Sequence, residues 1–234
     1  MKLVKLALMI LGACSLLTNA YASEESKWID GLLNSDESVR LTKEINERHI
    51  QEADYFIQRG SVNPVVWYLR GAYGSGRQYF YHKALLAAGK RYRRYVPENQ
   101  ALIKEYQSYY QKAMDLDDNP DAPEHLTVMM LNGIGSDSVG DPAIKVRALE
   151  KAAALARAGK NIGGSEMFEW NTYEARVGIY VDAKDYANAL KIVNEMLERF
   201  PNFRTDELLN WKQEMEAKVE KQKQQAAEGE KETL

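Results

Sequence analysis

Residues 173–202 read YEARVGIYVDAKDYANALKIVNEMLERFPN, and this stretch decides the fold. Its apolar residues follow the spacing of two helical faces, which a short polar turn at Asp182–Asp185 separates. Pro201 ends the second face, because proline cannot donate the backbone hydrogen bond that continues a helix. The stretch therefore predicts a helix–turn–helix pair. One such pair cannot bury its apolar face alone, so we expect it to stack on neighbouring helices.

The predicted pair resembles one tetratricopeptide repeat, a helix–turn–helix unit of about 34 residues. Positions that the repeat fills with aromatic, small or apolar residues and a closing proline are occupied by Tyr173, Tyr180, Tyr186, Ala189, Val193, Met196 and Pro201. Leu131–Gly135 and Ala148–Ala153 are similar to the Sel1-like variant of the repeat. The resemblance implies an all-α fold, an irregular tetratricopeptide-like α-solenoid of antiparallel helix pairs.

Composition also favours helices. The chain has 234 residues, of which 45% are hydrophobic and 28% charged, which suits one compact domain or a short array. Only six prolines occur. The formal net charge of −3 does not provide the overall basic field that nucleic-acid binding uses, so we expect no nucleic-acid partner.

Residues 1–22 are predicted to be an export signal and not part of the fold. Lys2 and Lys5 precede a short apolar run, and Ala20-Tyr21-Ala22 has the small-residue pattern of a cleavage site. We therefore expect the mature protein to begin at Ser23 and to be periplasmic, in a bacterium.

Cys14 leaves a second localisation open. The sequence Leu11-Gly12-Ala13-Cys14 resembles a lipobox, and a lipidated Cys14 would make the protein an outer-membrane lipoprotein. Against this reading, the apolar run continues past Cys14 instead of giving way to a polar linker. If the signal is cleaved after Ala22, the mature chain has no cysteine for disulfides or thiol chemistry.

The mature chain is predicted to have four parts. Residues 23–60 form an N-terminal helical segment, residues 61–202 the repeat-like region, residues 203–225 a capping helix and residues 226–234 a disordered tail. In the N-terminal segment, four apolar residues are expected to dock onto the array: Trp28, Ile29, Leu32 and Leu33. In the repeat-like region we expect one helix pair at Val65–Tyr73 and Gln78–Tyr95, with Gly74-Ser75-Gly76 as its turn.

Residues 70–97 combine positive charge with aromatic rings, and no acidic residue interrupts them. Arginine and tyrosine dominate binding hot spots, because both give large contact area with directed hydrogen bonds. We predict a groove that binds acidic or carboxylate groups of a partner through Trp67, Arg70, Tyr73, Arg77, Tyr79, Arg91 and Arg94. The alternative is that the rings are helix packing and the arginines a solvated face.

The remaining patterns predict neither a cofactor nor a metal ion. Asp115–Asp121 offers oxygens at alternating positions, but Pro120 and Leu126 stand where a calcium loop needs glycine and a bidentate glutamate. No P-loop, dinucleotide fingerprint or nucleophile elbow occurs. The histidines also lack metal-site spacing; they are His49, His82 and His125.

These observations predict a non-enzymatic scaffold or adaptor that binds another envelope protein or peptide. Two alternatives stay open. The first is a lipid-anchored accessory subunit of a secretion, pilus or envelope-assembly machine, which would contact a membrane through Cys14. The second is a helical cell-wall hydrolase, which would need a carboxylate with a strongly raised pKa in a concave pocket.

Overall fold

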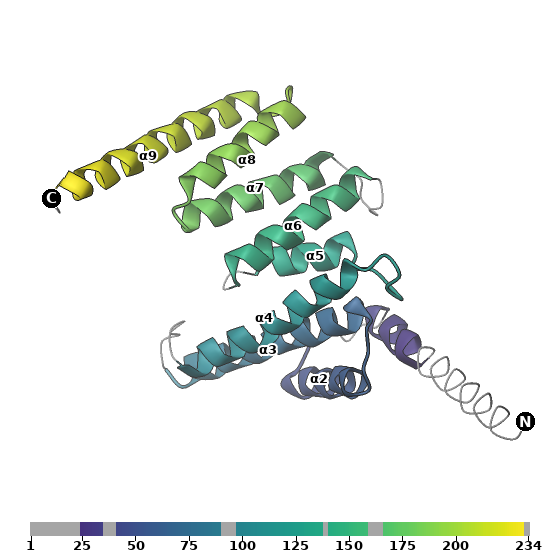
Figure 1. Ribbon diagram of the computed structural model, residues 1–234. Coiled ribbons are helices and arrows are strands. Elements are labelled where there is room, and N and C mark those ends of the chain that lie inside the picture. The colour runs from purple at the N-terminus through teal and green to yellow at the C-terminus, as the bar shows by residue number, and fades with distance from the viewer. Residues whose placement is uncertain (1–23, 35–40, 90–96, 138–139, 159–165, 232–234) are drawn as a thin grey trace, which may run out of the picture. The chain divides into compact units, whose positions relative to one another are not determined.

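The computed structural model describes residues 24–34, 41–89, 97–137, 140–158 and 166–231. Within these ranges the chain is all-α and contains no strand, which confirms the predicted fold class at that level (Figure 1). The chain divides into two compact units, Met1–His125 and Leu126–Leu234. The predictions about the export signal, Cys14, Arg91 and Arg94 concern residues outside the described ranges.

Unit 1 contains the helical residues 24–33, here called the N-terminal helix, and helices α2 (Lys43–Gln58), α3 (Pro64–Ala87) and α4 (Pro97–Asp117). Helices α2 and α4 both pack against α3. Asn63 caps α3 by accepting a hydrogen bond from the amide of Val65, and Pro64 stands at the start of the helix, where a missing amide hydrogen costs nothing.

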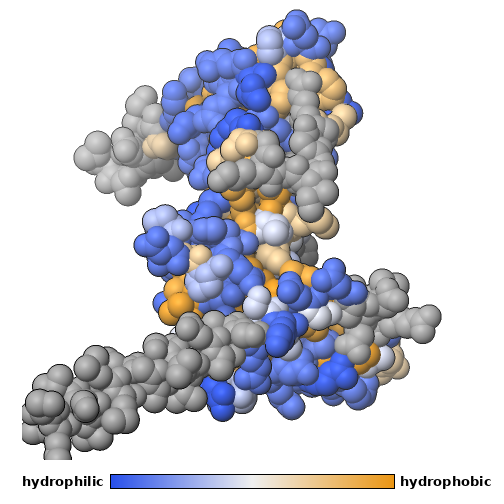
Figure 2. All heavy atoms as spheres, turned by 90° about the vertical axis from the view of Figure 1, so that its right-hand side faces the viewer, coloured by the Kyte–Doolittle hydropathy of each residue, from blue (hydrophilic) through white to orange (hydrophobic). Residues whose placement is uncertain are grey.

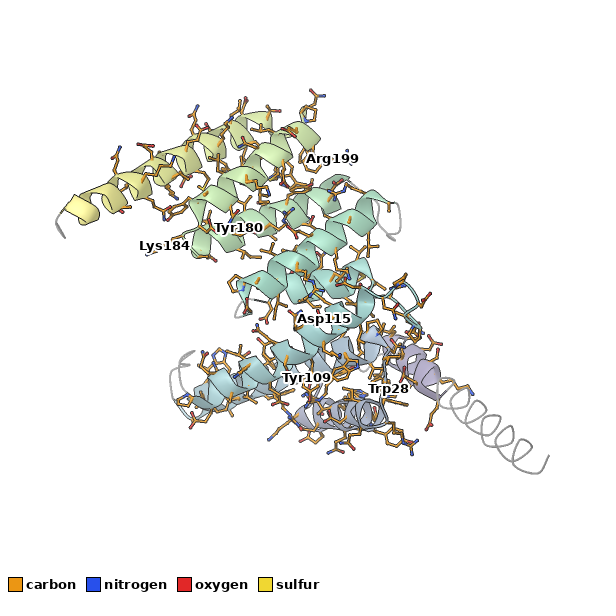
Figure 3. The ribbon with its side chains drawn as sticks, viewed as in Figure 1. Trp28, Tyr109, Asp115, Tyr180, Lys184 and Arg199 are labelled. Atoms are coloured by element: carbon orange, nitrogen blue, oxygen red, sulfur yellow. The ribbon has the colours of Figure 1, made fainter. Side chains whose placement is uncertain are left out.

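The N-terminal helix packs on α2, which lies in the same predicted N-terminal segment and not in the array onto which docking was predicted. The ring of Trp28 lies 5.1 Å from that of Phe56, and its indole nitrogen donates to Glu52 at 3.0 Å (Figure 3). Ile29 is buried at 1% exposure, as predicted, whereas Leu33 remains 53% exposed, so the prediction that Leu33 docks is wrong. One side of this helix is therefore part of the core of unit 1.

Helix α3 runs without interruption from Pro64 to Ala87. The prediction of two helices joined by a turn at Gly74-Ser75-Gly76 is therefore wrong. Three glycines within six residues are typical of a turn, because glycine in a helix costs up to about 1 kcal/mol relative to alanine. Here tertiary packing overrides that local preference.

The glycines of α3 allow α4 to approach closely. A Cβ atom on Gly71 would lie 2.6 Å from Cδ1 of Tyr110, and one on Gly74 would lie 2.8 Å from Cβ of Tyr106. Both tyrosines are buried in the core, at 6% and 1% exposure. The same residues that suggested a turn thus bring α3 and α4 side by side (Figure 1).

Unit 2 contains α5 (Val128–Gly135), α6 (Pro142–Arg157), α7 (Glu166–Asp182), α8 (Tyr186–Arg199) and α9 (Thr205–Lys231). Each of these helices packs against the helix next to it in sequence, as the ribbon shows (Figure 1). Helices α7 and α8 are the helix–turn–helix pair that residues 173–202 predicted.

The turn between α7 and α8 depends on Lys184, whose φ of 58° is left-handed. Its amide donates to the carbonyl of Val181, and the amide of Asp185 donates to that of Tyr180, which satisfies the last carbonyls of α7. Asp185 then caps α8 by accepting from the amide of Asn188. Figure 3 shows Lys184 at this turn.

The core of unit 2 is made by α7, α8 and α9. Its buried members are Trp170, Tyr173, Val177, Ala189, Ile192, Val193, Met196, Phe200, Leu208 and Met215. Of the residues that carried the resemblance, Tyr173, Ala189, Val193 and Met196 are buried here, and Tyr180 and Tyr186 are partly buried. The apolar pattern of the quoted stretch therefore identified true core positions.

Helix α9 continues to Lys231, past the boundary at Gln225 that the sequence predicted. The extension contains Ala226, Glu228 and Glu230, which are strong helix formers. Closer to its start, Leu208 and Met215 face the core, and Gln222 donates to the backbone carbonyl of Lys184 at 2.8 Å. The helix thus covers α8 along several turns.

Candidate functional site

Five of the seven predicted binding residues fall within the described ranges, and they differ in exposure. Arg70 is buried at 3% exposure, Trp67, Tyr73 and Arg77 are partly buried, and Tyr79 is exposed at 57%. The structure therefore places Arg70 inside unit 1 instead of on an exposed groove. Partner binding by the other candidates stays a prediction.

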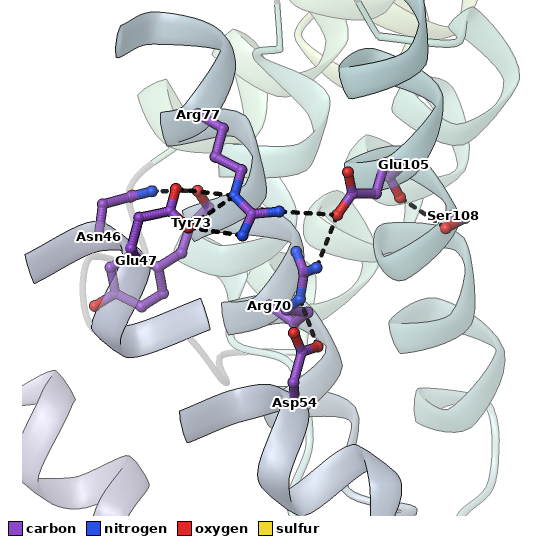
Figure 4. Close-up of polar contacts among 8 residues, drawn as sticks. All are labelled: Asn46, Glu47, Asp54, Arg70, Tyr73, Arg77, Glu105 and Ser108. Carbon is purple, nitrogen blue, oxygen red and sulfur yellow. Dashed lines mark hydrogen bonds and ion pairs between the residues drawn. The ribbon is translucent and has the colours of Figure 1, made fainter. Parts of the chain in front are cut away.

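The buried Arg70 is the centre of an ion-pair network whose other members are partly exposed (Figure 4). Its Nε atom lies 2.7 Å from Oδ1 of Asp54 in α2, and its Nη2 atom lies 2.7 Å from Oε1 of Glu105 in α4. The guanidinium also stacks over the ring of Tyr109, 4.3 Å from its centroid. Burial opposes the charge, but the hydrogen bonds to Glu105 and Asp54 outweigh it, so the pKa of Arg70 is raised.

Arg77 extends the network one step along α3. Its Nη2 atom lies 2.7 Å from Oε2 of Glu47, and its Nη1 atom lies 3.4 Å from Oε1 of Glu105. Glu105 therefore bridges both arginines, and the two guanidinium charges face three carboxylates (Figure 4). The network links α2, α3 and α4. Its carboxylates balance the positive charge of Arg70 and Arg77, which were predicted from the sequence to bind a partner.

Tyr73 and Trp67 also have contacts within unit 1. The backbone carbonyl of Tyr73 accepts from the side-chain amide of Asn46 at 3.0 Å, and its ring lies 4.7 Å from that of His49. Asn46 is fully buried against Gly76, where an added Cβ would collide with the amide group. The indole of Trp67 donates to the carbonyl of Ser61 at 2.9 Å. These contacts favour a packing role, which the sequence left open.

Sequence reasoning missed the carboxylates, although a signal for two of them was present. Glu47 and Asp54 stand seven positions apart in α2, and Arg70 and Arg77 stand seven positions apart in α3. Residues at that spacing lie on one face of a helix. Antiparallel packing then pairs the first acid with the second arginine and the second acid with the first. Glu105 in α4 has no comparable spacing signal.

The contribution of Arg77 to stability is expected to be present at neutral pH and to be lost at acid pH. The hydrogen bond from Arg77 is the largest effect on Glu47 and lowers its pKa. Because the pKa of Glu47 is lower in the folded protein than in the unfolded chain, the stabilisation is present at pH values above the unfolded-state pKa. It is lost as the pH falls through the folded-state pKa. We expect Arg77→Gln to lower the free energy of unfolding by about 1 kcal/mol at pH 7, and by less at pH 3. Urea denaturation at several pH values would measure this, and a cost that is equal at both pH values would contradict it.

Unit 2 contains an ion-pair cluster in which the buried member is a carboxylate. Glu169 is 5% exposed and accepts two hydrogen bonds from Arg199, at 3.1 and 3.0 Å. Arg157 lies 3.4 Å from the same carboxylate and donates to the hydroxyl of Tyr173 at 2.8 Å. The ends of α6 and α8 are thereby fixed to α7. Like the network of unit 1, this cluster uses its charges within the chain.

The last turns of α3 present a different kind of surface. Tyr79, Lys83 and Leu86 are all exposed, and their spacing places them on one face of the helix. Tyr79 and Leu86 are 57% and 58% exposed, although both are large and apolar. We call these three residues the Tyr79 face. On the face of the molecule drawn in Figure 2, both hydrophilic and hydrophobic residues of the described ranges reach the surface.

The described ranges contain no candidate metal site and no candidate membrane span. Where side chains are described, no three His, Cys, Asp or Glu residues gather as a metal ion would require. None of the described helices combines the length and the apolar character needed to cross a bilayer. In comparisons with known proteins, no family model, no curated protein and no solved structure matches this chain.

Proposed function

We propose that this protein is a non-enzymatic scaffold or adaptor of the cell envelope, a tetratricopeptide-like α-solenoid that binds another protein. The observation that carries the proposal is the packing of α5 to α9, each against its neighbour in sequence. Repeat proteins pack in this way and use the extended surfaces that result to bind partners. The burial of Tyr173, Ala189, Val193 and Met196 between α7, α8 and α9 supports the likeness to the repeat.

The proposed contact surface is the Tyr79 face. Tyr79 and Leu86 offer apolar area that unit 1 leaves exposed, and tyrosine is enriched among residues that dominate binding energy. Lys83 lies between them, and no acidic residue occurs from Arg70 to Pro97. The partner that suits this face therefore presents acidic groups beside an apolar side chain. The attraction would weaken with salt, because exposed charges are screened over about 8 Å at physiological ionic strength.

The proposed location is the periplasm, after removal of residues 1–22. Lys2, Lys5 and the Ala20-Tyr21-Ala22 pattern support it. Intact-mass measurement of the mature protein tests this part separately. A chain that begins at Ser23 agrees with the proposal, whereas a diacylated Cys14 at the N-terminus would make the protein a lipid-anchored accessory subunit instead.

Site-specific photo-crosslinking would test the contact surface. We expect a crosslinkable phenylalanine analogue at position 79 or 86 to capture the same envelope protein, and the analogue at position 220 to capture none. Glu220 is a matched control, because it is exposed on a helix in unit 2.

A separate variant tests whether the positive charge of Lys83 attracts the partner. Lys83→Glu should reduce capture from position 79 at low salt, in protein whose melting temperature is unchanged. Equal capture from positions 79 and 220, or capture that Lys83→Glu leaves intact, would contradict the Tyr79 face as a specific acidic-partner site.

A further inference from the structure

The start of the N-terminal helix places a carboxylate in the interior of unit 1. Glu25 is only 6% exposed, and it is hydrogen-bonded to the side chains of Ser61 and Asn63. Both of these residues belong to the connection between α2 and α3. The docked helix thus brings an acidic side chain into a contact that only the folded unit creates.

A second carboxylate lies close to the same helix start. The hydroxyl of Ser26 donates to Oε1 of Glu124 at 3.4 Å, and Glu124 belongs to the segment that follows α4. Glu124 acts on Glu25 as a like charge. When both groups are ionised, docking therefore brings two negative charges together and takes one of them out of water.

The rest of the N-terminal helix favours docking. Ile29 is buried, and Trp28 packs on Phe56 and donates to Glu52. Glu52 itself lies 2.9 Å from Nδ1 of His49 and 3.8 Å from Nε of Arg48. Among the described residues, the titratable groups that contact this helix are Glu124 at its start and Glu52 on α2, and Glu52 in turn contacts His49 and Arg48.

We propose that the N-terminal helix is a proton-dependent latch, which docks tightly when Glu25 takes up a proton and loosens when Glu25 and Glu124 are both charged. The apolar contacts of Trp28 and Ile29 supply the attraction, and the charge state of Glu25 adjusts it. Release of the helix uncovers Phe56 on α2, which is 4% exposed in the docked state. The latch thus controls access to an apolar part of unit 1.

The direction of the pH dependence follows from the buried carboxyl. Burial is the largest effect on Glu25 and raises its pKa, Ser61 and Asn63 lower it, and Glu124 raises it further. Because the net pKa is raised in the docked state, docking takes up a proton. Docking is weakest above the docked-state pKa, strengthens as pH falls through it, and gains nothing more below the ordinary pKa of a free glutamate.

Hydrogen exchange in the full chain tests the latch. After correction for the intrinsic exchange rate, protection of amides 26–33 should rise relative to α4 as pH falls from about 7.5 to about 4.5. The expected rise is about tenfold for each pH unit by which the docked pKa exceeds the free one. In Glu25→Gln, the side-chain oxygen can still accept from Ser61 and Asn63 and its amide can donate to Glu124. Protection in that variant should therefore be high at every pH.

Two further variants test whether the pH dependence comes from Glu25 and its like-charged neighbour. Glu24→Gln neutralises an exposed glutamate beside Glu25 and should keep the wild-type pH profile. Glu124→Gln removes the like charge and should flatten the profile in part, which supplies a second test if Glu25→Gln fails to fold. A wild-type profile without pH dependence overturns the proposal. A dependence that survives Glu25→Gln and disappears in His49→Gln also overturns it, because it would assign the effect to the contact of His49 with Glu52.

Discussion

Replacement of Arg70 by alanine is expected to lower the free energy of unfolding by roughly 3 kcal/mol. The change leaves Asp54 and Glu105 without the guanidinium that joins them, and it removes the planar group that stacks on Tyr109. Breaking a buried ion pair by removing one partner costs roughly 3–5 kcal/mol. We take the lower end, because the side chains of Asp54 and Glu105 are 32% and 36% exposed, so water can solvate part of their charge. Urea denaturation followed by circular dichroism at pH 7 measures the loss.

Arg77→Ala is the matched comparison, because both arginines lie in α3 and both contact Glu105. The side chain of Arg77 is 30% exposed, against 4% for Arg70, so its removal should cost only about 1 kcal/mol. Arg70→Lys should recover little of the stability, since one ammonium cannot reproduce the two directed contacts of the guanidinium. Equal costs for Arg70→Ala and Arg77→Ala would show that burial does not determine the strength of this network.

Gly74→Leu is expected to destabilise unit 1 by about 3 kcal/mol, the upper end of the usual cost of overpacking a core. The new Cβ atom would lie 2.8 Å from Cβ and 3.6 Å from Cα of Tyr106. These atoms cannot rotate away as the end of a flexible side chain could, so α3 and α4 must separate. Thermal and urea denaturation would both report the change.

Gly178→Leu provides the control for helix propensity. Gly178 lies within α7 and is exposed, and a Cβ atom added there would have no atom within 4 Å apart from its chain neighbours and the nearby backbone of its own helix. Leucine there should stabilise the protein by about 0.5–1 kcal/mol, because glycine is a poor helix former. Opposite signs at the two positions are expected. Destabilisation by both substitutions, or by neither, would contradict the assignment of Gly74 to close packing.

Helices α7 and α8 were predictable because their signals are local. Asp185, the apolar spacing of α8 and Pro201 mark the start, the buried face and the end of that helix within the quoted stretch. In α3 the local signal was misleading, because its glycines indicated a turn where the helix continues. Gly71 and Gly74 are explained by Tyr110 and Tyr106 on another helix, and a pattern confined to residues 64–87 contains no information about that helix.

The same limit applies to the candidate site. The sequence correctly singled out Arg70 and Arg77 as unusual, but it assigned their charge to an outside partner. Their carboxylates come from α2 and α4, so the pairing exists only after the helices pack. The equal spacing of Glu47 and Asp54 shows that such networks can be sought in advance, by comparing charge intervals between helices expected to be antiparallel. Tyr79 differs from the two arginines, because it is exposed. No helix among the described residues covers it, and its neighbours in sequence could not indicate this.

The neighbour-to-neighbour packing of α5 to α9 has a consequence for how unit 2 assembles. Each new interface closes only a short length of chain, which keeps the entropy cost of loop closure small and favours rapid folding. The helices can therefore add one at a time in the order in which the chain is delivered. Trp170 is the exception, because its ring meets Phe200 at the end of α8, Phe203 in the following turn and Trp211 in α9. Its surroundings are complete only when the last helix arrives, so the fluorescence of Trp170 would mark the final step of assembly.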